Sequence, residues 1–219
     1  MQPQLLDLFD KTYSFDNFIS INNDIVIQLL KKYTSQFIHI VGARHSGKTH
    51  LLNAWVSNAP GTSYYMNYTS KDQSIRELAN QYTYIAIDNV DHLNDEQQIE
   101  LFDLFNKIKL NNLPNQLLTS SSTNLESVAR LRIDLKTRLL SGINQSLKAL
   151  NDNELFEAID LFTANEGIKL QLAEKSYLIN HYTRSIGVLI ETIHKLAEMA
   201  VLEKRNITIP FIKQILLNK

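Results

Sequence analysis

Residues 37–52 read FIHIVGARHSGKTHLL, and they contain a complete G-x-x-x-x-G-K-T pattern at residues 42–49. A short run rich in β-branched residues precedes the pattern, and residues that can wind into a helix follow it. A strand, a glycine-rich turn and a helix in this order form the context in which the pattern binds phosphate. The turn points backbone N–H groups inward, and the start of the helix adds partial positive charge. The stretch therefore predicts a site for a nucleoside triphosphate or diphosphate.

Each part of the pattern has its own task at such a site. Lys48 is predicted to reach the β and γ phosphates, and the hydroxyl group of Thr49 to hold a Mg²⁺ ion. A glycine-bearing turn that binds nothing is the alternative, and the complete pattern with both flanks argues against it. The candidate nucleotide-binding residues in this stretch are Gly42, His45, Ser46, Gly47, Lys48, Thr49 and His50.

The chain has 219 residues, enough for one large domain or two small ones with a buried core. Its 44% hydrophobic and 21% charged residues are typical of soluble globular proteins. The 22 basic residues are balanced by 23 acidic ones. This balance argues against a protein that binds DNA mainly through contacts with the DNA phosphates. The absence of cysteine excludes disulfides, thiol nucleophiles and thiolate zinc sites.

The N-terminal stretch, MQPQLLDLFDKT, lacks the basic start of a signal peptide. No apolar run in the chain reaches the length of about 18 residues that a bilayer requires. We therefore expect a cytoplasmic protein with no membrane partner. Residues 4–9 form an apolar cluster ahead of the folded body, and such a cluster either folds back on its own domain or docks in a partner's pocket. The residues by themselves favour folding back.

A second apolar run, YTYIAIDNV at residues 82–90, is typical of a buried strand and ends in Asp88. Because it follows the phosphate loop in the chain, Asp88 is predicted to place its carboxylate beside the Mg²⁺ ion. Asn89 comes next and joins the candidate nucleotide-binding residues, but an amide cannot act as a general base near neutral pH. We therefore expect hydrolysis at this site to be weak or absent. Asp91 is a substitute base at a less favourable spacing.

The rest of the first 149 residues alternates between strand-like and helical runs. Five strands separated by helices, with the phosphate loop after the first, predict a parallel α/β sheet. Ser121 follows the fourth strand in a polar cluster and is a candidate contact for the nucleotide, although such a cluster can also be a simple turn. The aromatic residues of segment 13–18 fit a wall for the base and a place in the core equally well. Strands are expected at residues 37–41, 62–67, 82–90, 116–119 and 143–147, and helices at 23–33, 49–56, 70–80, 95–110 and 130–140.

The composition changes near residue 150, because everything after it reads as helix. Helices are expected at 153–166, 173–181 and 185–204 and from Phe211 onward, with a short extended segment at 207–210. In the earlier helix at 95–110, the residues expected to face the core are Ile99, Phe102, Leu104, Phe105 and Ile108. We divide the chain into a tail at 1–12, an α/β nucleotide-binding subdomain at 13–149 and a small all-helical lid subdomain at 150–219.

The order of these parts along the chain resembles that of the AAA+ family. The parts are, in sequence, the phosphate loop, the strand that ends in Asp88, the polar end of the fourth strand, the arginine-bearing helix and the helical lid. Within that family, the chain looks like the DnaA-related replication-initiator branch, and most like its Hda-like members. The resemblance covers essentially the whole chain. It rests on the phosphate loop together with YSFDNF at 13–18, IDN at 87–89, LTS at 118–120, DLKTRL at 134–139 and ITIPFI at 207–212.

Two features favour the Hda-like members over the initiators themselves. DnaA-like initiators continue past the lid into a helix-turn-helix domain that reads DNA, whereas this sequence ends at Lys219, shortly after the lid. Hda-like proteins also carry an N-terminal peptide of the form Q-L-x-x-x-L/F that binds the DNA polymerase sliding clamp, and QLLDLF at residues 4–9 is similar. The resemblance therefore favours clamp docking over folding back. The residues expected to bind the clamp are Gln4, Leu5, Leu8 and Phe9.

The resemblance implies a negative regulator of chromosomal replication initiation. Such a protein holds ADP or ATP with Mg²⁺, docks on the sliding clamp and presents Arg138 as an arginine finger to the ATP bound by a DnaA-type initiator. It contacts DNA only indirectly, through the clamp. The alternative is a self-acting AAA+ ATPase such as a helicase loader. The resident nucleotide and the formation of a homo-oligomer are left open.

Four positions depart from the family pattern. The sensor position at the end of the fourth strand is often acidic in the family, and here it is Ser121 or Ser122. The strand-end Asp is commonly followed there by a Glu that polarises the attacking water, where this chain has Asn89. A sensor arginine from the lid falls on Gly187, with Arg184 one turn earlier as the nearby basic candidate. The first arginine of the basic helix falls on Asp134. These changes predict a nucleotide-holding protein with weakened hydrolytic parts and an intact Arg138.

Overall fold

The computed structural model describes residues 13–16, 18–19, 22–69 and 74–217. The chain forms two compact units. The first holds the β-sheet and reaches to Lys148, except for residues 45–47, and the second consists of these three residues and the helical part from Ala149 onward. Each unit has its own hydrophobic core, which in the first unit lies on both faces of the sheet and in the second lies between the helices. The candidate clamp-binding residues, Gln4, Leu5, Leu8 and Phe9, lie outside the described residues.

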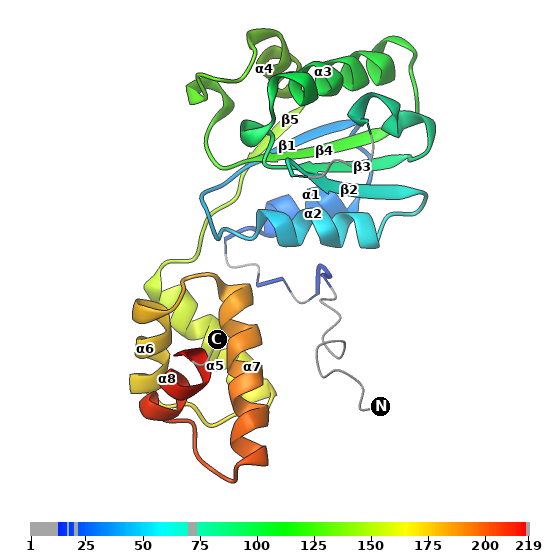
Figure 1. Ribbon diagram of the computed structural model, residues 1–219. Coiled ribbons are helices and arrows are strands. Elements are labelled where there is room, and N and C mark those ends of the chain that lie inside the picture. Colours follow the sequence, from blue (N-terminus) through cyan, green and yellow to red (C-terminus); the bar gives the residue numbers. More distant parts are fainter. Residues whose placement is uncertain (1–12, 17, 20–21, 70–73, 218–219) are drawn as a thin grey trace, which may run out of the picture. The chain divides into compact units, whose positions relative to one another are not determined.

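The sheet of the first unit has five strands, β1 (Phe37–Val41), β2 (Ser63–Asn67), β3 (Tyr84–Asp88), β4 (Gln116–Ser121) and β5 (Ile143–Ser146). All are parallel and follow the order β2-β3-β4-β1-β5, which confirms the predicted five-stranded parallel sheet (Figure 1). β4 pairs with β1 on one side and with β3 on the other. The carboxyl ends of these three strands therefore meet at one edge of the sheet, which is where ligands bind in such folds.

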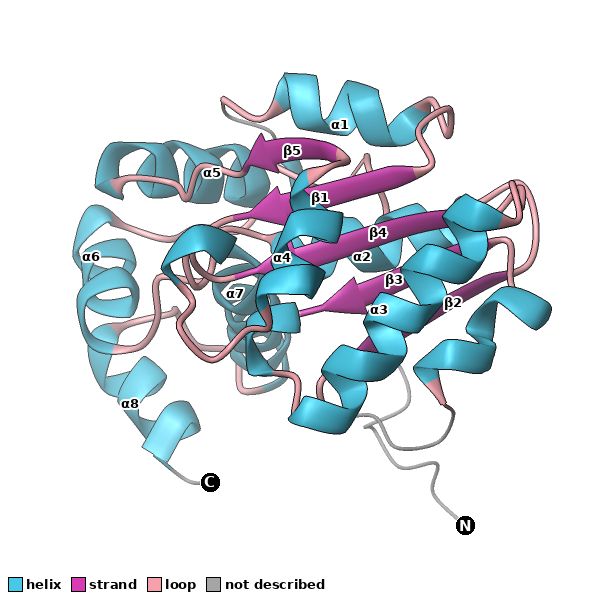
Figure 2. Ribbon diagram, turned by 90° about the horizontal axis from the view of Figure 1, so that it is seen from above, coloured by secondary structure: helices cyan, strands magenta, loops and turns pink. Residues whose placement is uncertain are grey.

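Helices cover both faces of this sheet. They are α1 (Asp24–Lys31), α2 (Lys48–Ser57), α3 (Asp95–Leu110) and α4 (Ile133–Leu140), with the short 3₁₀ helices η1 (Ile75–Asn80), η2 (Val90–His92) and η3 (Leu125–Ser127). α1 and α2 lie on one face, and α3 and α4 lie on the other (Figures 1 and 2). Because side chains alternate along a strand, Ile40 and Leu118 pack with Trp55 of α2, whereas Ile87 and Leu117 pack on the α3 and α4 face.

α3 has the bounds that the sequence predicts. Asn94 caps its first turn, because the Asn94 side chain accepts a hydrogen bond from the backbone N–H of Gln97. The Gln97 side chain in turn accepts one from the backbone N–H of Asn94. This reciprocal pair satisfies two of the N–H groups that have no partner inside the helix.

The core face of α3 differs from the prediction at one residue. Ile99 is 40% exposed, whereas Leu101 is fully buried. Gln98 occupies the buried place beside Leu101, since its side-chain amide donates to the carbonyl of Leu93 and accepts from the N–H of Arg132. A polar side chain with two backbone partners thus displaces the expected isoleucine.

The helix expected to start at Thr69 or Ser70 and to run to about Asn80 is instead the short η1. Ser70 lies outside the described residues. A carboxylate of α3 fixes the start of η1, because Glu100 accepts hydrogen bonds from the Ser74 hydroxyl group and the Ile75 N–H. A side chain from another helix therefore sets this boundary.

The second unit consists of α5 (Asp152–Asn165), α6 (Leu172–His181), α7 (Ile186–Leu202) and α8 (Ile209–Leu217). Asn151 and Glu154 cap α5 with the same reciprocal pair that starts α3. Ile209 and Pro210, which the sequence places in an extended segment, begin α8 instead. Proline is tolerated in a first turn because the N–H groups there lack an intrahelical partner. None of the described helices is long and apolar enough to cross a membrane.

Gly187→Ala is expected to stabilise the second unit. Gly187 lies in the first turn of α7, where an added Cβ would meet no atom within 4 Å. Alanine loses less conformational entropy in a helix, so the free energy of unfolding, measured by urea denaturation, should rise by about 0.5–1 kcal/mol. Gly167→Ala is the matched control, because Gly167 has a φ of +66°. A side chain in that conformation costs about 1–2 kcal/mol, and equal effects of the two changes would contradict these backbone assignments.

Candidate nucleotide-binding site

The phosphate loop connects β1 to α2. Gly42 continues the pairing of β1 with β4, because its N–H donates to the carbonyl of Ser121 at 3.1 Å. His45 and Gly47 then adopt left-handed backbone conformations, with φ of +67° and +93°. These two residues turn the chain before α2 begins at Lys48. The loop therefore ends on a helix N-terminus, which is the arrangement that binds phosphate.

Lys48 is 7% exposed, and its Nζ donates to the carbonyls of Gly42 at 2.7 Å and Ala43 at 3.1 Å. Burial lowers the pKa of Lys48, while the negative charges of Asp88 and Asp91 act in the opposite direction. A phosphate oxygen is charged and is a stronger acceptor than these carbonyls. The amine is therefore held beside the loop, and a phosphate oxygen bound there would compete with these two carbonyls for it.

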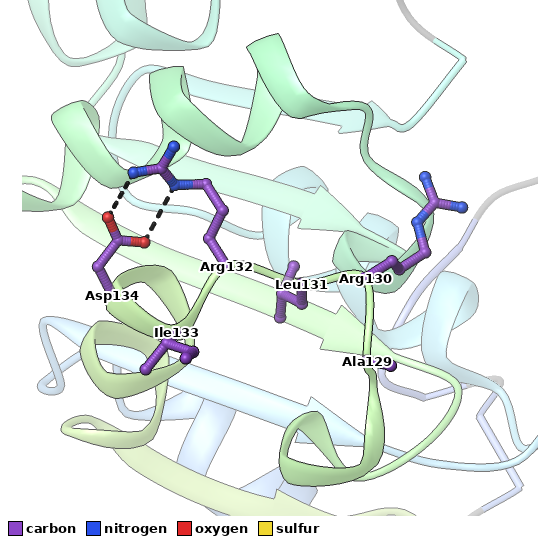
Figure 3. A pocket seen from close by; sticks show the side chains of 6 residues that line it. All are labelled: Ala129, Arg130, Leu131, Arg132, Ile133 and Asp134. Carbon is purple, nitrogen blue, oxygen red and sulfur yellow. Dashed lines mark hydrogen bonds and ion pairs between the residues drawn. The ribbon is translucent and has the colours of Figure 1, made fainter.

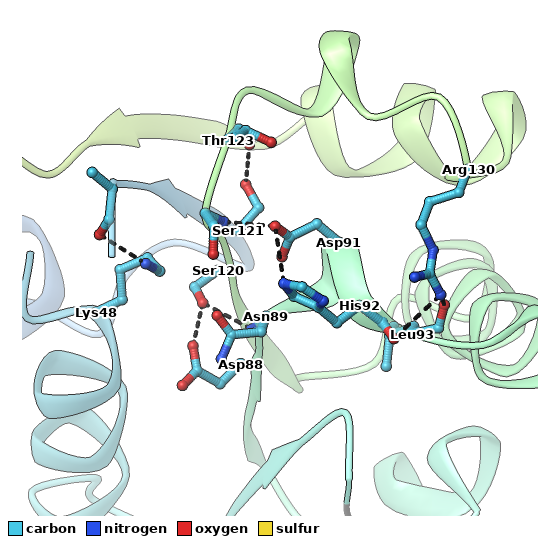
Figure 4. Close-up of polar contacts among 12 residues, drawn as sticks. Lys48, Asp88, Asn89, Asp91, His92, Leu93, Ser120, Ser121, Thr123 and Arg130 are labelled. Atoms are coloured by element: carbon cyan, nitrogen blue, oxygen red, sulfur yellow. Dashed lines mark hydrogen bonds and ion pairs between the residues drawn. The ribbon is translucent and has the colours of Figure 1, made fainter. Parts of the chain in front are cut away.

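Asp88 is the centre of a polar cluster at the ends of β3 and β4 (Figure 4). Its Oδ2 accepts hydrogen bonds from Thr49 Oγ1 at 2.6 Å and from the Tyr65 hydroxyl group at 3.1 Å. Its Oδ1 accepts one from the hydroxyl group of Ser120. The two candidate Mg²⁺ ligands, Thr49 and Asp88, are thus in direct contact, and both offer the oxygen atoms that Mg²⁺ prefers.

Sequence reasoning misses Tyr65 and Ser120. Residues two apart in a strand share a face, so Ser120 lies on the side of Leu118, and Asp88 on the side of Ala86. That alternation is a signal that could have identified Ser120. Tyr65 approaches from β2, where burial and the nearby charge of Asp88 raise its pKa. No sequence pattern links Tyr65 to Asp88, because β2 and β3 meet only in the folded sheet.

Asn89 turns the chain after β3. It has a φ of +55°, and its N–H donates to Ser120 Oγ at 3.0 Å. η2 follows and brings Asp91 to the end of β4, where Oδ2 of Asp91 accepts a hydrogen bond from the N–H of Ser122 at 3.0 Å (Figure 4). Asp91 is 8% exposed. The chain therefore has an amide at Asn89 and places a carboxylate two residues later, at Asp91.

Ser121 turns its side chain to the opposite face of the sheet from Ser120. Its hydroxyl group donates to the carbonyl of Thr123 at 2.6 Å and lies 3.0 Å from Nε2 of His39. Nδ1 of His39 lies 2.8 Å from the hydroxyl group of Thr119, which also donates to the carbonyl of Ile38 at 3.4 Å, and the tautomer of the ring decides which nitrogen donates. Burial lowers the pKa of His39 to about 4, so the ring is neutral near neutral pH. The Ser121 side chain thus contacts His39, whereas the Ser120 side chain contacts Asp88, one of the two candidate Mg²⁺ ligands.

His50 follows Thr49 on α2 and carries a group of aromatic neighbours. Its Nε2 lies 2.9 Å from the carbonyl of Ser14, and the rings of Tyr13 and Phe18 meet it edge-on at 5.2 and 5.4 Å. Burial lowers the pKa of His50, and the Ser14 hydrogen bond acts against this shift. Phe15 is buried in the core. The aromatic segment therefore supplies one core residue and two rings that lie beside the start of α2.

Arg138 lies in the last turn of α4, on the α3 and α4 face of the sheet. Its guanidinium group lies 5.8 Å from the centre of the Phe102 ring, within the range of a cation–π interaction. Within the described part of the chain, this group makes no ion pair and no hydrogen bond. A shallow hollow lined by residues 129–134 precedes α4, and there Arg132 makes two hydrogen bonds to Asp134, which lower the pKa of Asp134 (Figure 3). Arg132 is thus paired, and Arg138 is not.

In the second unit, Arg184 forms an ion pair with Asp152 at the start of α5. Gly187, where the resemblance places a sensor arginine, stands in the first turn of α7 and offers no side chain. Arg184 is the nearby basic candidate. Its charge is engaged within its own unit.

Residues 152–216 match the family model of the Hda lid domain. A Haemophilus influenzae protein described as uncharacterized is 30% identical over 217 residues, which cover 93% of this chain and 93% of that protein. A structure of the replication initiator DnaA bound to AMPPCP and single-stranded DNA superposes with a TM-score of 0.70 at 22% identity, over 90% of this chain and 70% of that one. Domain III of the Thermotoga maritima initiator DnaA superposes with a TM-score of 0.73 at 19% identity, over 95% of this chain and 97% of that one. The two superpositions show that the fold is shared.

His39→Gln is expected to reduce the loss of stability in acid. In the unfolded chain His39 binds a proton below about pH 6.5, but in the folded chain only below about pH 4. The folded state therefore loses stability as the pH falls between these values, by roughly 3 kcal/mol at its lower end. A glutamine amide does not titrate, and it can bond to both hydroxyl groups.

Urea denaturation at pH 7 and pH 4.5 measures this difference in the free energy of unfolding. His92→Gln is the matched control for loss of an imidazole, because the His92 side chain is half exposed. The assignment fails if His39→Gln shows the same loss in acid as the parent chain.

Proposed function

Because this chain belongs to the DnaA-related, Hda-like AAA+ proteins, we propose that it is a negative regulator of chromosomal replication initiation. In this role it holds a nucleotide of its own, docks on the DNA polymerase sliding clamp and promotes hydrolysis of the ATP bound to a DnaA-type initiator. The ATP that is hydrolysed is the one bound to the initiator. The protein contacts DNA only indirectly, through the sliding clamp.

The nucleotide held by this chain is ADP or ATP with Mg²⁺. Thr49 and Asp88 supply oxygen atoms for the metal, and Lys48 supplies positive charge for the phosphates. The contact between Thr49 and Asp88 supports this assignment, because it gathers hard oxygen donors at the end of the phosphate loop. When bound, the metal neutralises charge on the phosphates. The rings of Tyr13 and Phe18, beside the start of α2, are the candidates for contact with the base.

The observation that carries the proposal is the state of Arg138. Its guanidinium group is held over Phe102, and no carboxylate among the described residues neutralises it. By contrast, Arg76, Arg132 and Arg184 each pair with a carboxylate. A guanidinium group is planar and matches phosphate oxygens with two parallel donors. Arg138 is therefore suited to stabilise the charge that develops on a partner's γ-phosphate.

Arg138→Ala is expected to abolish most of the stimulation of initiator hydrolysis. An arginine supplied to a partner's site contributes about 10³–10⁵ in rate, so the stimulated rate should fall by a factor on the order of 10³ or to the unstimulated rate. The measurement is hydrolysis of ATP preloaded on a purified DnaA-type initiator, with the sliding clamp loaded on DNA. Arg132→Ala is the matched control, since Arg132 is exposed and already paired with Asp134. Full stimulation by the Arg138→Ala variant would refute the arginine-finger role.

Replacing Leu8 and Phe9 together by alanine is expected to weaken binding to the sliding clamp. A buried hydrophobic anchor contributes about 2 kcal/mol or more to an interface, so affinity should fall by at least 30-fold. Surface plasmon resonance with immobilised clamp measures the change, and Asp7→Ser in the same peptide is the control. Nucleotide affinity should stay as it is, because the phosphate loop is untouched. Unchanged clamp affinity would remove the docking step from the proposal.

A further inference from the structure

The hydroxyl group of Thr49 has a fixed direction. Thr49 is exposed at the start of α2, whereas its partner Asp88 is buried at the end of β3. Oγ1 of Thr49 donates its hydrogen to Oδ2 of Asp88 at 2.6 Å. A hydroxyl group has one hydrogen and two lone pairs, so the lone pairs of Thr49 are left for a cation. The value of Thr49 as a metal ligand therefore depends on the position of the Asp88 carboxylate.

Two further hydroxyl groups hold that carboxylate. Oδ2 of Asp88 also accepts a hydrogen bond from the hydroxyl group of Tyr65 at 3.1 Å. Oδ1 accepts one from Ser120, whose Oγ in turn accepts from the N–H of Asn89 at 3.0 Å (Figure 4). A turn of the carboxylate would break at least one of these contacts. Tyr65 and Ser120 thus fix one oxygen each.

Tyr65 has a second connection, which leads back to α2. The side chain of Asn53 hydrogen-bonds with the hydroxyl group of Tyr65, and Nδ2 of Asn53 donates to the carbonyl of Thr49 at 2.8 Å. Thr49, Asp88, Tyr65 and Asn53 therefore form a closed ring of polar contacts. The hydroxyl group of a half-buried tyrosine needs a partner, and a backbone carbonyl would be sufficient. Here the partner is the carboxylate that orients the candidate metal ligand.

We propose that Tyr65 is a positioning residue for the cation that accompanies the nucleotide. Through Asp88, Tyr65 keeps the hydrogen of Thr49 directed inward and leaves the lone pairs of Thr49 for the cation. The inference rests on the proposed binding of a nucleotide with Mg²⁺. Residues that orient metal ligands in this way change metal affinity by about 10–100-fold when they are replaced. Tyr65 acts through Asp88 and needs no contact of its own with the nucleotide.

Tyr65→Phe tests the inference, because it removes the hydroxyl group and keeps the ring. The affinities of the full-length chain for ADP and for AMPPCP are measured by titration calorimetry, once with Mg²⁺ and once with EDTA. With Mg²⁺, the affinity of the variant should fall by about 10-fold or more. With EDTA it should equal that of the parent, because the phosphate loop and Lys48 are unchanged. The ratio of the two affinities should therefore fall.

Two more variants separate positioning from a structural role. Tyr64→Phe is the matched control, because Tyr64 is the next residue of β2 and its ring stacks on Tyr82 at 4.8 Å, on the other face of the sheet. It should keep the ratio of the parent. Asn53→Ala removes the other contact of the Tyr65 hydroxyl group without a change in aromatic packing, and it should lower the ratio by a smaller factor. A purely structural role of Tyr65 would lower the melting temperature and leave the ratio as it is.

The outcomes are distinct. If the parent chain binds neither nucleotide, the proposed nucleotide binding itself is wrong. If the parent binds a nucleotide equally well with Mg²⁺ and with EDTA, or if Tyr65→Phe keeps the parent ratio, the positioning role is overturned and nucleotide binding stands. If Tyr65→Phe does not fold, Asn53→Ala decides, and the parent ratio in that variant would overturn the inference. A ratio that falls in Tyr65→Phe but not in Tyr64→Phe supports it.

Discussion

The hydrogen bond between Thr49 and Asp88 joins the start of α2 to the end of β3, and the geometry of the candidate nucleotide site depends on it. It can form because β4 lies between β1 and β3, so that their carboxyl ends open on one edge of the sheet. Ser120 adds the third strand by donating to the other oxygen of Asp88. Three segments that are far apart in the sequence are thereby fixed around a single carboxylate.

Features that depend on neighbouring residues could be predicted from the sequence. The turn before α2, the strand that ends in Asp88 and the cap of α3 each depend on residues that are close in the chain. Contacts between distant elements could not be predicted in this way. Glu100 sets the start of η1, Gln98 takes the core place expected of Ile99, and Tyr65 reaches across the sheet to its partner. In each case a polar side chain finds its partner on another element, and hydrophobic periodicity carries no information about such partners.

In the first unit, the candidate metal-binding residues and Arg138 lie on different faces of the sheet. Thr49 and Asp88 lie at the strand ends beside α2, whereas Arg138 lies in α4 on the other face. The guanidinium group is therefore suited to a phosphate outside its own unit.

The ring of His39 constrains how this sequence can change. It is buried between two hydroxyl groups, and each of its nitrogen atoms depends on one of them. Exchange of Ser121 for an apolar residue would leave a ring nitrogen of His39 without its partner, at a cost of about 1–3 kcal/mol. Exchange of His39 for an apolar residue would leave the Thr119 hydroxyl group with the carbonyl of Ile38, at 3.4 Å, as its remaining partner. Positions 39, 119 and 121 are therefore coupled, and a change at one of them has to keep a polar partner for the other two.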